Sequence, residues 1–480
     1  MSGLFGVLNL SARALAVVQG GIRTTSHNVA NVNTPGYSRQ RQVLEAGRPI
    51  PSGEGQIGTG VEQRTIDRVT DGFVQHELVQ QGASVGSTDV EARTLSQIEE
   101  VLNEQGGPGL TASLSQLYDG FQDLATASAA GQPSERAAVR AAASSLVDGI
   151  HQADTRLRSL QKANDRAIVD ALPEINSLAE RISALNQDIR RIEVQAPAND
   201  LRDEREQLVR ELAGKVDVTT FEQNDGAVVV TLSNGLPLVE GLHARTLQAQ
   251  ADPTNPFDPT FSKVYYDDGT NQLDVTAQIG GGELGGLLRS RDSLIPAAIR
   301  SLDTIAYNLA SSVNAVHAAG VGLDGLSGDF FAAPAAVADA ARDLALDPRI
   351  LASTDAIAAG TTAGATDNRN ALALAALRTT AAPIYLPGDA PGSPSGPARS
   401  VLDHAASVVA DVGEQSRSAA QARDQQSRVM EGLENRRDAV SAVSLDEEMT
   451  DLIRLQAAFQ ANAKVVSAVD RMLQDVLSML

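Results

Sequence analysis

The sequence predicts a mainly α-helical, elongated, multi-domain chain with an inserted β region. Apolar residues recur at three- and four-residue steps at both ends of the chain and again from 134 to 193. This spacing is typical of helices that pack along one face. From 214 to 280 apolar and polar residues alternate between turn signals, as in antiparallel strands. We therefore expect terminal helices that form a coiled coil, a shaft of long bundled helices and a small antiparallel β outer domain.

The N-terminal segment carries an apolar stripe that ends in a turn-rich stretch. The stripe contains Leu4, Leu8, Leu15 and Val18. A helix with such a stripe needs a partner surface. The helical pattern fails at Asn28, and residues with turn preferences follow, among them Asn31, Thr34, Pro35, Gly36 and Tyr37. Pro35 and Gly36 suit the central positions of a type II turn.

The C-terminal segment has the matching properties. Ser444 and Glu447 form a capping-box signature that predicts the start of a helix. The apolar stripe behind it contains Met449, Leu452, Phe459 and Val466, and after a short skip it resumes at Val469, Leu473, Val476 and Leu480. We expect both terminal stripes to form an assembly interface and both termini to lie at one end of the molecule.

The longest helical signal runs from about 134 to 193, with Pro173 expected to kink or interrupt it. Further helices are expected at 85–104, 110–127, 290–318 and 401–441. The hairpins of 214–280, including the Asn234-Gly235 turn, are expected to be separable from the shaft. The stretch 320–400 is rich in Ala, Gly and Pro and is expected to end in a linker at 383–397.

These signals divide the chain into seven segments. We expect an N-terminal coiled-coil helix and turn at 1–45, helical shaft at 46–213, a β-rich outer domain at 214–284, a shaft helix at 285–318, an irregular outer segment and linker at 319–400, helical shaft at 401–444 and a C-terminal coiled-coil helix at 445–480. The helical segments alternate with the inserted ones, so the chain is expected to run outward and return.

Charge and composition exclude several classes of function. The formal net charge of -21 argues against nucleic acid as a partner, because phosphate binding needs a cationic surface. Residues 1–50 differ from the rest, with five arginines and one glutamate. The absence of cysteine excludes disulfides and thiolate chemistry. We see no cleaved signal peptide and no run that approaches the length of a membrane span, so no membrane partner is expected.

Motifs that could carry chemistry are better explained as structure. The run Gly82 to Gly86 matches a nucleophile elbow, but the residues before it are polar and do not form a buried strand. The run Gly320 to Gly325 matches a dinucleotide fingerprint, but it follows a helix. His317 is expected to satisfy a helix end, and Asp267 and Asp268 to form a hairpin turn. We expect no enzyme activity, cofactor or metal.

Both ends of the sequence resemble those of flagellar axial proteins. The resemblance lies in Ser26 to Gln40 at the N-terminus and in Leu445 to Lys464 at the C-terminus. The interior is similar to the family of the first hook-associated protein at Ile175 to Asn186, at Asn199 to Arg205 and from Asn314 to Phe331. Glu204 and Glu206 stand where that family more usually has Gln and Asp. The middle of the chain is also short for the family, which implies that an additional outer domain is missing.

The resemblance implies a structural subunit at the junction of hook and filament, outside the cell, that leaves through the flagellar type III export apparatus. It also implies self-association in a ring, contacts with the hook subunit and with the second junction protein, and an export chaperone at the C-terminal helix. A hook or distal-rod subunit is the nearest alternative, but it should have a β-dominated shaft. An enzyme hidden in 214–400 and a secreted coiled-coil adhesin are further alternatives.

Overall fold

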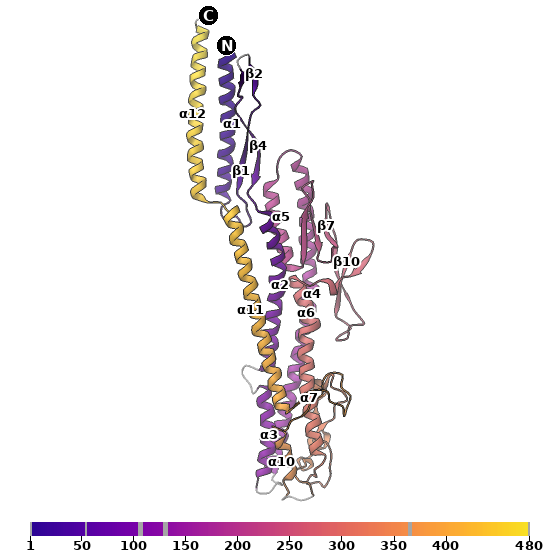
Figure 1. Cartoon of the computed structure of the whole chain (residues 1–480). Helices are drawn as coiled ribbons and strands as arrows, with labels where there is room; N and C mark the ends of the chain where they lie inside the picture. The colour runs from indigo at the N-terminus through magenta and orange to yellow at the C-terminus, as the bar shows by residue number, and fades with distance from the viewer. Residues whose placement is uncertain (1, 53–54, 104–108, 128–132, 363–366, 479–480) are drawn as a thin grey trace.

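The computed structural model describes residues 2–52, 55–103, 109–127, 133–362 and 367–478 as an elongated rod (Figure 1). The N- and C-terminal helices lie side by side at one end of the rod, as expected from the sequence. Long helices continue the rod to the opposite end, and the sheets project from its side. The chain therefore runs outward through its first half and returns through its last helices.

One end of the rod is a unit built from α1 (Ser2–Ala30), α12 (Leu445–Ser478) and four short strands. We call it the terminal unit. Its strands are β1 (Gln40–Ala46), β2 (Ile50–Ser52), β3 (Gly55–Ile57) and β4 (Val61–Arg68). They form antiparallel pairs, β1 with β4 and β2 with β3.

The prediction of helical shaft from residue 46 onward is wrong for residues 46–68. Gly55, Gly58 and Gly60, together with Pro51, disfavour a helix. Gly60 has a φ of +95°, which a side chain would strain. These residues therefore extend the hairpin of the terminal unit.

The shaft is a bundle of long helices. They are α2 (Gly72–Asn103), α3 (Leu110–Thr126), α4 (Pro133–Glu193), α5 (Asn199–Lys215), α6 (Gly282–Arg289), α7 (Ile295–His317) and α11 (Val401–Ser441). α2 begins earlier than predicted, because Val74 and Leu78 form a buried stripe hidden among polar neighbours. α6 also precedes the expected helix, and a π-helical turn, Ser290–Leu294, joins it to α7.

The 61-residue helix α4 passes through Pro173 without the expected interruption. A proline inside a helix removes one backbone hydrogen bond, here to the carbonyl of Val169. Val169 is 38% exposed, so water can reach this part of the helix surface. The buried stripe on the two sides of Pro173, including Ile168, Leu172 and Ile175, is continuous. Packing along this stripe outweighs the loss of a single hydrogen bond.

Two hydrophobic cores divide the rod along its length. The distal core, farther from the termini, joins α3, α7 and the ends of α2, α4 and α11. The middle core joins α2, α4, α5 and α6 with strands. These strands are β5 (Val218–Glu222), β6 (Val228–Leu232), β7 (Pro237–Glu240), β8 (His243–Ala244), β9 (Thr246–Ala251) and β10 (Ser262–Asp267). A further strand, β11 (Gln272–Asp274), pairs with β10 and contributes no residue to this core.

The β region is antiparallel, as predicted, but it is not a separable outer domain. Its sheets have the strand orders β5-β6-β7-β8 and β11-β10-β9, and Gly235 takes the positive φ that the hairpin turn requires. Val230, Leu232 and Val264 are buried in the same core as Ile175 and Ile182 of α4. One face of the sheets thus covers the shaft helices and completes their core.

The segment 319–400 is largely irregular, as expected, yet much of it is core. Phe330, Phe331 and Leu374 are fully buried in the distal core. The predicted linker at 383–397 is instead held in place, because the Tyr385 backbone N–H donates to Asn308 Oδ1 at 2.8 Å. The short elements here are β12 (Phe331–Ala332), α8 (Ala340–Asp343), β13 (Ala345–Leu346), α9 (Pro348–Ala352), α10 (Arg369–Ala376), β14 (Ala382–Pro383) and β15 (Ala398–Arg399).

Candidate assembly interface

A continuous heptad stripe of buried and partly buried positions runs along α1, which packs against α12. The stripe contains Leu4, Leu8, Ser11, Leu15, Val18, Ile22 and Thr25. Its members alternate four- and three-residue steps, which is the spacing of a coiled-coil seam. All four apolar residues predicted for the N-terminal interface therefore lie on one seam. The opposite side of α1 carries the hairpin, where the Gln42 amide donates to the Val17 carbonyl at 3.0 Å.

α12 runs antiparallel to α1 and presents a matching stripe. Its less exposed positions are Glu448, Leu452, Leu455, Phe459, Asn462, Val466, Val469, Leu473 and Val476. The seam continues from Val466 to Val469 and Leu473 in steps of three and four residues, so the skip expected after Val466 is absent. Met449, predicted for the interface, lies off the seam and is 48% exposed. Leu480, the last predicted interface residue, lies outside the described residues.

Gly3–Ala30 of α1 is long and apolar enough to cross a membrane by length and composition alone. The expectation that no run approaches this length is therefore wrong. Only 28% of the most apolar window is buried. A helix that packs on α12 at one side and on a hairpin at the other needs the same composition. The length and composition of α1 are thus explained by its two neighbours in the rod.

Asn28, at the end of α1, organises the turn that follows. It is 1% exposed, and its Nδ2 donates to the Gln40 carbonyl at 2.9 Å. Its Oδ1 accepts from the Gln40 backbone N–H at 3.0 Å and from the Tyr37 hydroxyl at 2.8 Å. One amide side chain therefore satisfies both backbone polar groups of Gln40 at the start of β1. Burial, with Asp200, Asp203 and Glu448 nearby, raises the pKa of Tyr37, so its hydroxyl remains a donor.

The remaining predicted residues of the turn support its backbone. Asn31 Nδ2 donates to the His27 carbonyl at 3.0 Å, and the Thr34 hydroxyl donates to Asn31 Oδ1 at 3.1 Å. Gly36 has a φ of +80°, and a Cβ there would approach Gln207 and Arg210 of α5. These contacts fix the direction in which the chain leaves α1. Asn31, Thr34 and Gly36 thus shape the joint between α1 and the shaft.

The segment after the turn joins the two ends of the chain. Arg39 Nε donates to Glu448 Oε1 and Arg39 Nη1 to Glu447 Oε2, both at 2.7 Å. The Arg39 backbone N–H donates to the Ser441 carbonyl at 2.8 Å. Burial alone would lower the pKa of Arg39, but the two glutamates raise it above its usual value. The buried carboxyl group of Glu448, at the first seam position, is therefore bound by the N-terminal segment.

The same segment is tied to the shaft through α5. The Ser38 backbone N–H donates to Asp203 Oδ2 at 2.9 Å. Arg68, at the end of β4, donates to Asp203 Oδ1 and to Glu206 Oε1, both at 2.7 Å. Burial raises the pKa of Asp203, while the bonds from Ser38 and Arg68 oppose that rise. The described side chains of 2–68 and 445–478 belong to neither core, so this joint is polar.

Sequence reasoning selected Asn28 and Tyr37 but missed Arg39, Arg68, Asp203 and Glu448 as interface residues. These four residues are 135 to 409 positions away from their partners. The sequence did contain one indication of these residues, because Asp203, Arg39 and Glu448 all lie in segments that carry the family resemblance. Such segments from distant parts of a chain are expected to meet. Helical spacing alone could not predict the pairing.

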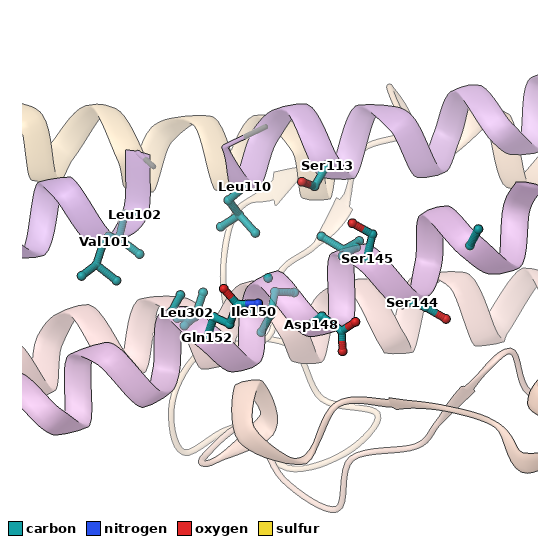
Figure 2. Close-up of a pocket in the computed structure, with 14 residues that line it drawn as sticks. Val101, Leu102, Leu110, Ser113, Ser144, Ser145, Asp148, Ile150, Gln152 and Leu302 are labelled. Carbon is teal, nitrogen blue, oxygen red and sulfur yellow. The ribbon is translucent and has the colours of Figure 1, made fainter. Parts of the chain in front are cut away.

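A cavity between the shaft helices has no feature of a catalytic site. It measures about 550 Å³ and lies between α2, α3, α4 and α7 (Figure 2). Leu102, Leu110, Ile150 and Leu302 line it with several serines, and Asp148 is the one titratable residue among the described residues that line it. A lone carboxylate without an acid, base or nucleophile partner does not form a catalytic set.

The motifs resembling catalytic signatures have structural roles. Gly82 to Gly86 lie inside α2, so no strand-to-helix elbow exists there. His317 Nδ1 contacts the Gly328 carbonyl at 2.7 Å, and its Nε2 accepts from the Ala358 N–H at 2.8 Å. Burial lowers the pKa of His317, in agreement with a neutral ring. This histidine joins the end of α7 to two loops, as the sequence predicted.

Comparisons with known proteins agree with this architecture. Residues 95–331 match the family model described as "Flagellar hook-associated protein FlgK helical domain", and residues 438–479 match "Flagellar basal body rod FlgEFG protein C-terminal". Flagellar hook-associated protein 1 of Bacillus subtilis is 29% identical over 100% of this chain and 99% of its own length. The protein of the same name from Escherichia coli is 28% identical over 96% and 97%.

A solved structure supports the fold. The flagellar hook junction protein FlgK from Burkholderia pseudomallei superposes with a TM-score of 0.63 at 17% identity. The superposition covers 76% of this chain and 100% of the other. The helical rod with paired termini, together with these matches, defines a structural axial protein of the bacterial flagellum. Within that class, the chain belongs to the flagellar hook-associated protein 1 family.

Proposed function

We propose that this chain is the structural subunit that joins the flagellar hook to the filament, and that it polymerises through its terminal helices. One observation carries the proposal. The terminal unit contributes no side chain to either core of the described chain, yet it exposes large apolar residues, including Phe5, Leu10 and Ile453. Large apolar side chains are unfavourable when they are exposed to water, and contact with another subunit would cover them.

The proposal includes the partners that the family implies. The subunits associate in a ring, with the hook subunit on one side and the second hook-associated junction protein on the other. The chain is exported through the flagellar type III apparatus, and a dedicated chaperone holds α12 beforehand. Its final location is extracellular. The proposed mechanism is assembly, and it uses no cofactor, nucleic acid or membrane.

Electron microscopy of cells that lack the protein tests this function. A junction subunit is required for filament growth but not for hook growth. The mutant cells should therefore carry hooks without filaments, with filament monomers in the medium. Expression of the intact chain should restore filaments. Cells that lack hooks as well would identify the chain as a hook or rod component, and normal filaments would overturn the proposal.

A further inference from the structure

The two hydrophobic cores of the shaft are separated by a polar layer. Along α4, Leu157 is the last buried residue of the distal core and Ile168 is the first of the middle core. The buried stripe continues between them in steps of four, three and four residues, so Gln161 and Asn164 occupy its two intervening positions. Both are amides, and they are 4% and 7% exposed. We call this level of the rod, formed by Gln161, Asn164 and the facing turn Ser290–Leu294, the waist.

The facing turn Ser290–Leu294 is π-helical and joins α6 to α7, which follow one another along the rod (Figure 1). The Ile295 N–H donates to the first carbonyl of the turn, five residues earlier. Pro296 has no N–H, so the next carbonyl, that of Arg291, lacks the partner that a further bond of this kind would give. Gln161 Nε2 donates to this carbonyl instead, at 2.9 Å. A π-turn carries one residue more than an α-helical turn, and helices bend at such turns.

Charged and polar contacts hold the waist together. Arg291 is 1% exposed, and its Nη1 donates to Asp165 Oδ1 at 2.7 Å and to the Ser262 carbonyl at 2.6 Å. Its Nε donates to Asp292 Oδ1 at 2.8 Å. The Ser290 hydroxyl is buried and has no hydrogen-bond partner within the described residues. A buried hydroxyl without a partner costs free energy, so the polar layer is not fully satisfied in this arrangement.

We propose that the waist is a bending point of the shaft. The middle and distal cores move as two rigid parts, and the π-turn takes up the change in length on its side of the bundle. Close-packed apolar cores resist deformation, whereas a polar layer beside a π-turn has fewer apolar contacts to lose. α2 and α4 cross the waist without interruption, so they curve instead of breaking. The expected motion is therefore a limited bend of a fully folded chain.

The inference goes beyond the proposed junction function. Bending is a property of the single chain, so it can be measured without hook or filament. In the proposed assembly each copy contacts two different polymers. A bend at the waist lets the middle and distal parts adjust to different neighbours while both cores stay intact.

The test is the distance between two nitroxide labels, measured by pulsed electron spin resonance on the purified full-length chain. The chain has no native cysteine, so two introduced thiols are the only ones labelled. Ser177→Cys with Ala315→Cys places exposed labels on α4 and α7 on opposite sides of the waist. Thr155→Cys with Ala315→Cys is the matched control, because both exposed positions belong to the distal part. The first pair should give a distance distribution about twice as broad as that of the control.

A change in the waist itself should reduce this breadth. The Asn164 amide donates to the Leu160 carbonyl of its own helix at 2.9 Å, so Asn164→Leu keeps the bond that Gln161 makes to the π-turn. The added side chain extends the apolar stripe across the polar layer. Asn164→Leu, added to the first pair, should narrow the distribution toward the width of the control pair. Ala163→Leu, at an exposed position of the same turn, should leave the distribution unchanged.

The outcomes separate the inference from the function. A broad distribution for the first pair alone, narrowed by Asn164→Leu, supports bending at the waist. Equal widths for the two pairs overturn it, and this comparison leaves the waist unchanged, so it stays decisive even if Asn164→Leu does not fold. A broad distribution that a folded Asn164→Leu variant does not narrow places the motion elsewhere and also overturns the inference. Filament growth in cells lacking the chain tests the junction function separately.

Discussion

At the scale of single residues, the joint between the terminal unit and the shaft depends on a few polar side chains. Asn28 binds both backbone groups of Gln40, Arg39 bridges to α12, and Asp203 receives bonds from Ser38 and Arg68. Buried polar groups are costly when one partner is removed. The sequence pointed to Asn28 and Tyr37 because they stand where helical spacing fails. It could not identify partners that the fold brings from distant segments.

Replacing Asn28 with Ala should destabilise the terminal unit. The change leaves the Gln40 N–H and carbonyl without partners, at a cost of about 1 to 3 kcal/mol. Hydrogen exchange should become faster in residues 37–46, while the shaft helices keep their protection. Asn33→Ala is the matched control, because Asn33 is exposed in the same turn. Equal exchange in the two variants would show that Asn28 does not organise the joint.

Asp303 of α7 should make stability depend on pH. Burial raises its pKa to about 6, although its oxygens accept from the Asp339 and Ala341 N–H groups. Because the pKa is higher in the folded state than in the unfolded state, the native protein binds more protons between about pH 4 and 6. The contribution of Asp303 to stability should therefore fall as pH rises through this window.

Asp303→Asn removes this titration but keeps an acceptor oxygen. The free energy of unfolding, measured by thermal unfolding, should fall more steeply between pH 4 and 6 for the intact chain than for the variant. The difference should be at most roughly 1.4 kcal/mol per unit of pKa shift. Asp343→Asn serves as the control, since Asp343 is exposed on the neighbouring helix α8. If the free energy of unfolding depends on pH equally in the intact chain and in Asp303→Asn, Asp303 is not the group that titrates in this window.

At the scale of elements, heptad spacing predicted the terminal helices and α4 well. These helices are long, and each buries one stripe, so their spacing is visible in the sequence. The prediction failed where tertiary contacts decide. The strands of 46–68 lack a strong pattern because they cover one side of α1, and α4 keeps its helix through Pro173 because its buried stripe is continuous. The alternation of apolar and polar residues predicted the β strands, but it did not show that these strands cover the shaft helices.

Replacing Lys215–Ile279 with a short Gly/Ser linker should disrupt the shaft. This result differs from the sequence-based expectation that the β region is a separable domain. The deletion uncovers Ile168, Ile175 and Ile182, each worth about 1.5 to 3 kcal/mol when buried. Their sum is comparable to the whole stability of a typical domain. Circular dichroism should show lost helix content. Replacing only the mostly exposed loop 254–257 is the control, and a fully helical deletion variant would contradict the shared core.

At the scale of the whole molecule, the rod separates folding from assembly. Two cores stabilise the shaft, and the terminal unit is attached to it through the polar contacts of the joint. The sequence predicted that both termini lie at one end, because both carry unpartnered stripes. The coiled coil expected between these two helices corresponds to the packing of α1 against α12. The apolar residues left exposed, including Phe5 and Ile453, lie outside that seam.

The central claim is that the terminal coiled coil mediates assembly while the shaft folds without it. Leu473→Asp with Val476→Asp places two charges in the seam, where each side chain otherwise contributes about 1.5 to 3 kcal/mol. Gln474→Asp with Ser478→Asp is the matched control, because both positions are exposed on α12.

The decisive measurement is electron microscopy of cells that carry the seam variant, paired with circular dichroism of the purified chain. The account predicts hooks without filaments and a shaft that retains most of its helical signal, whereas the control variant grows normal filaments. Normal filaments on cells carrying the seam variant would contradict the claim.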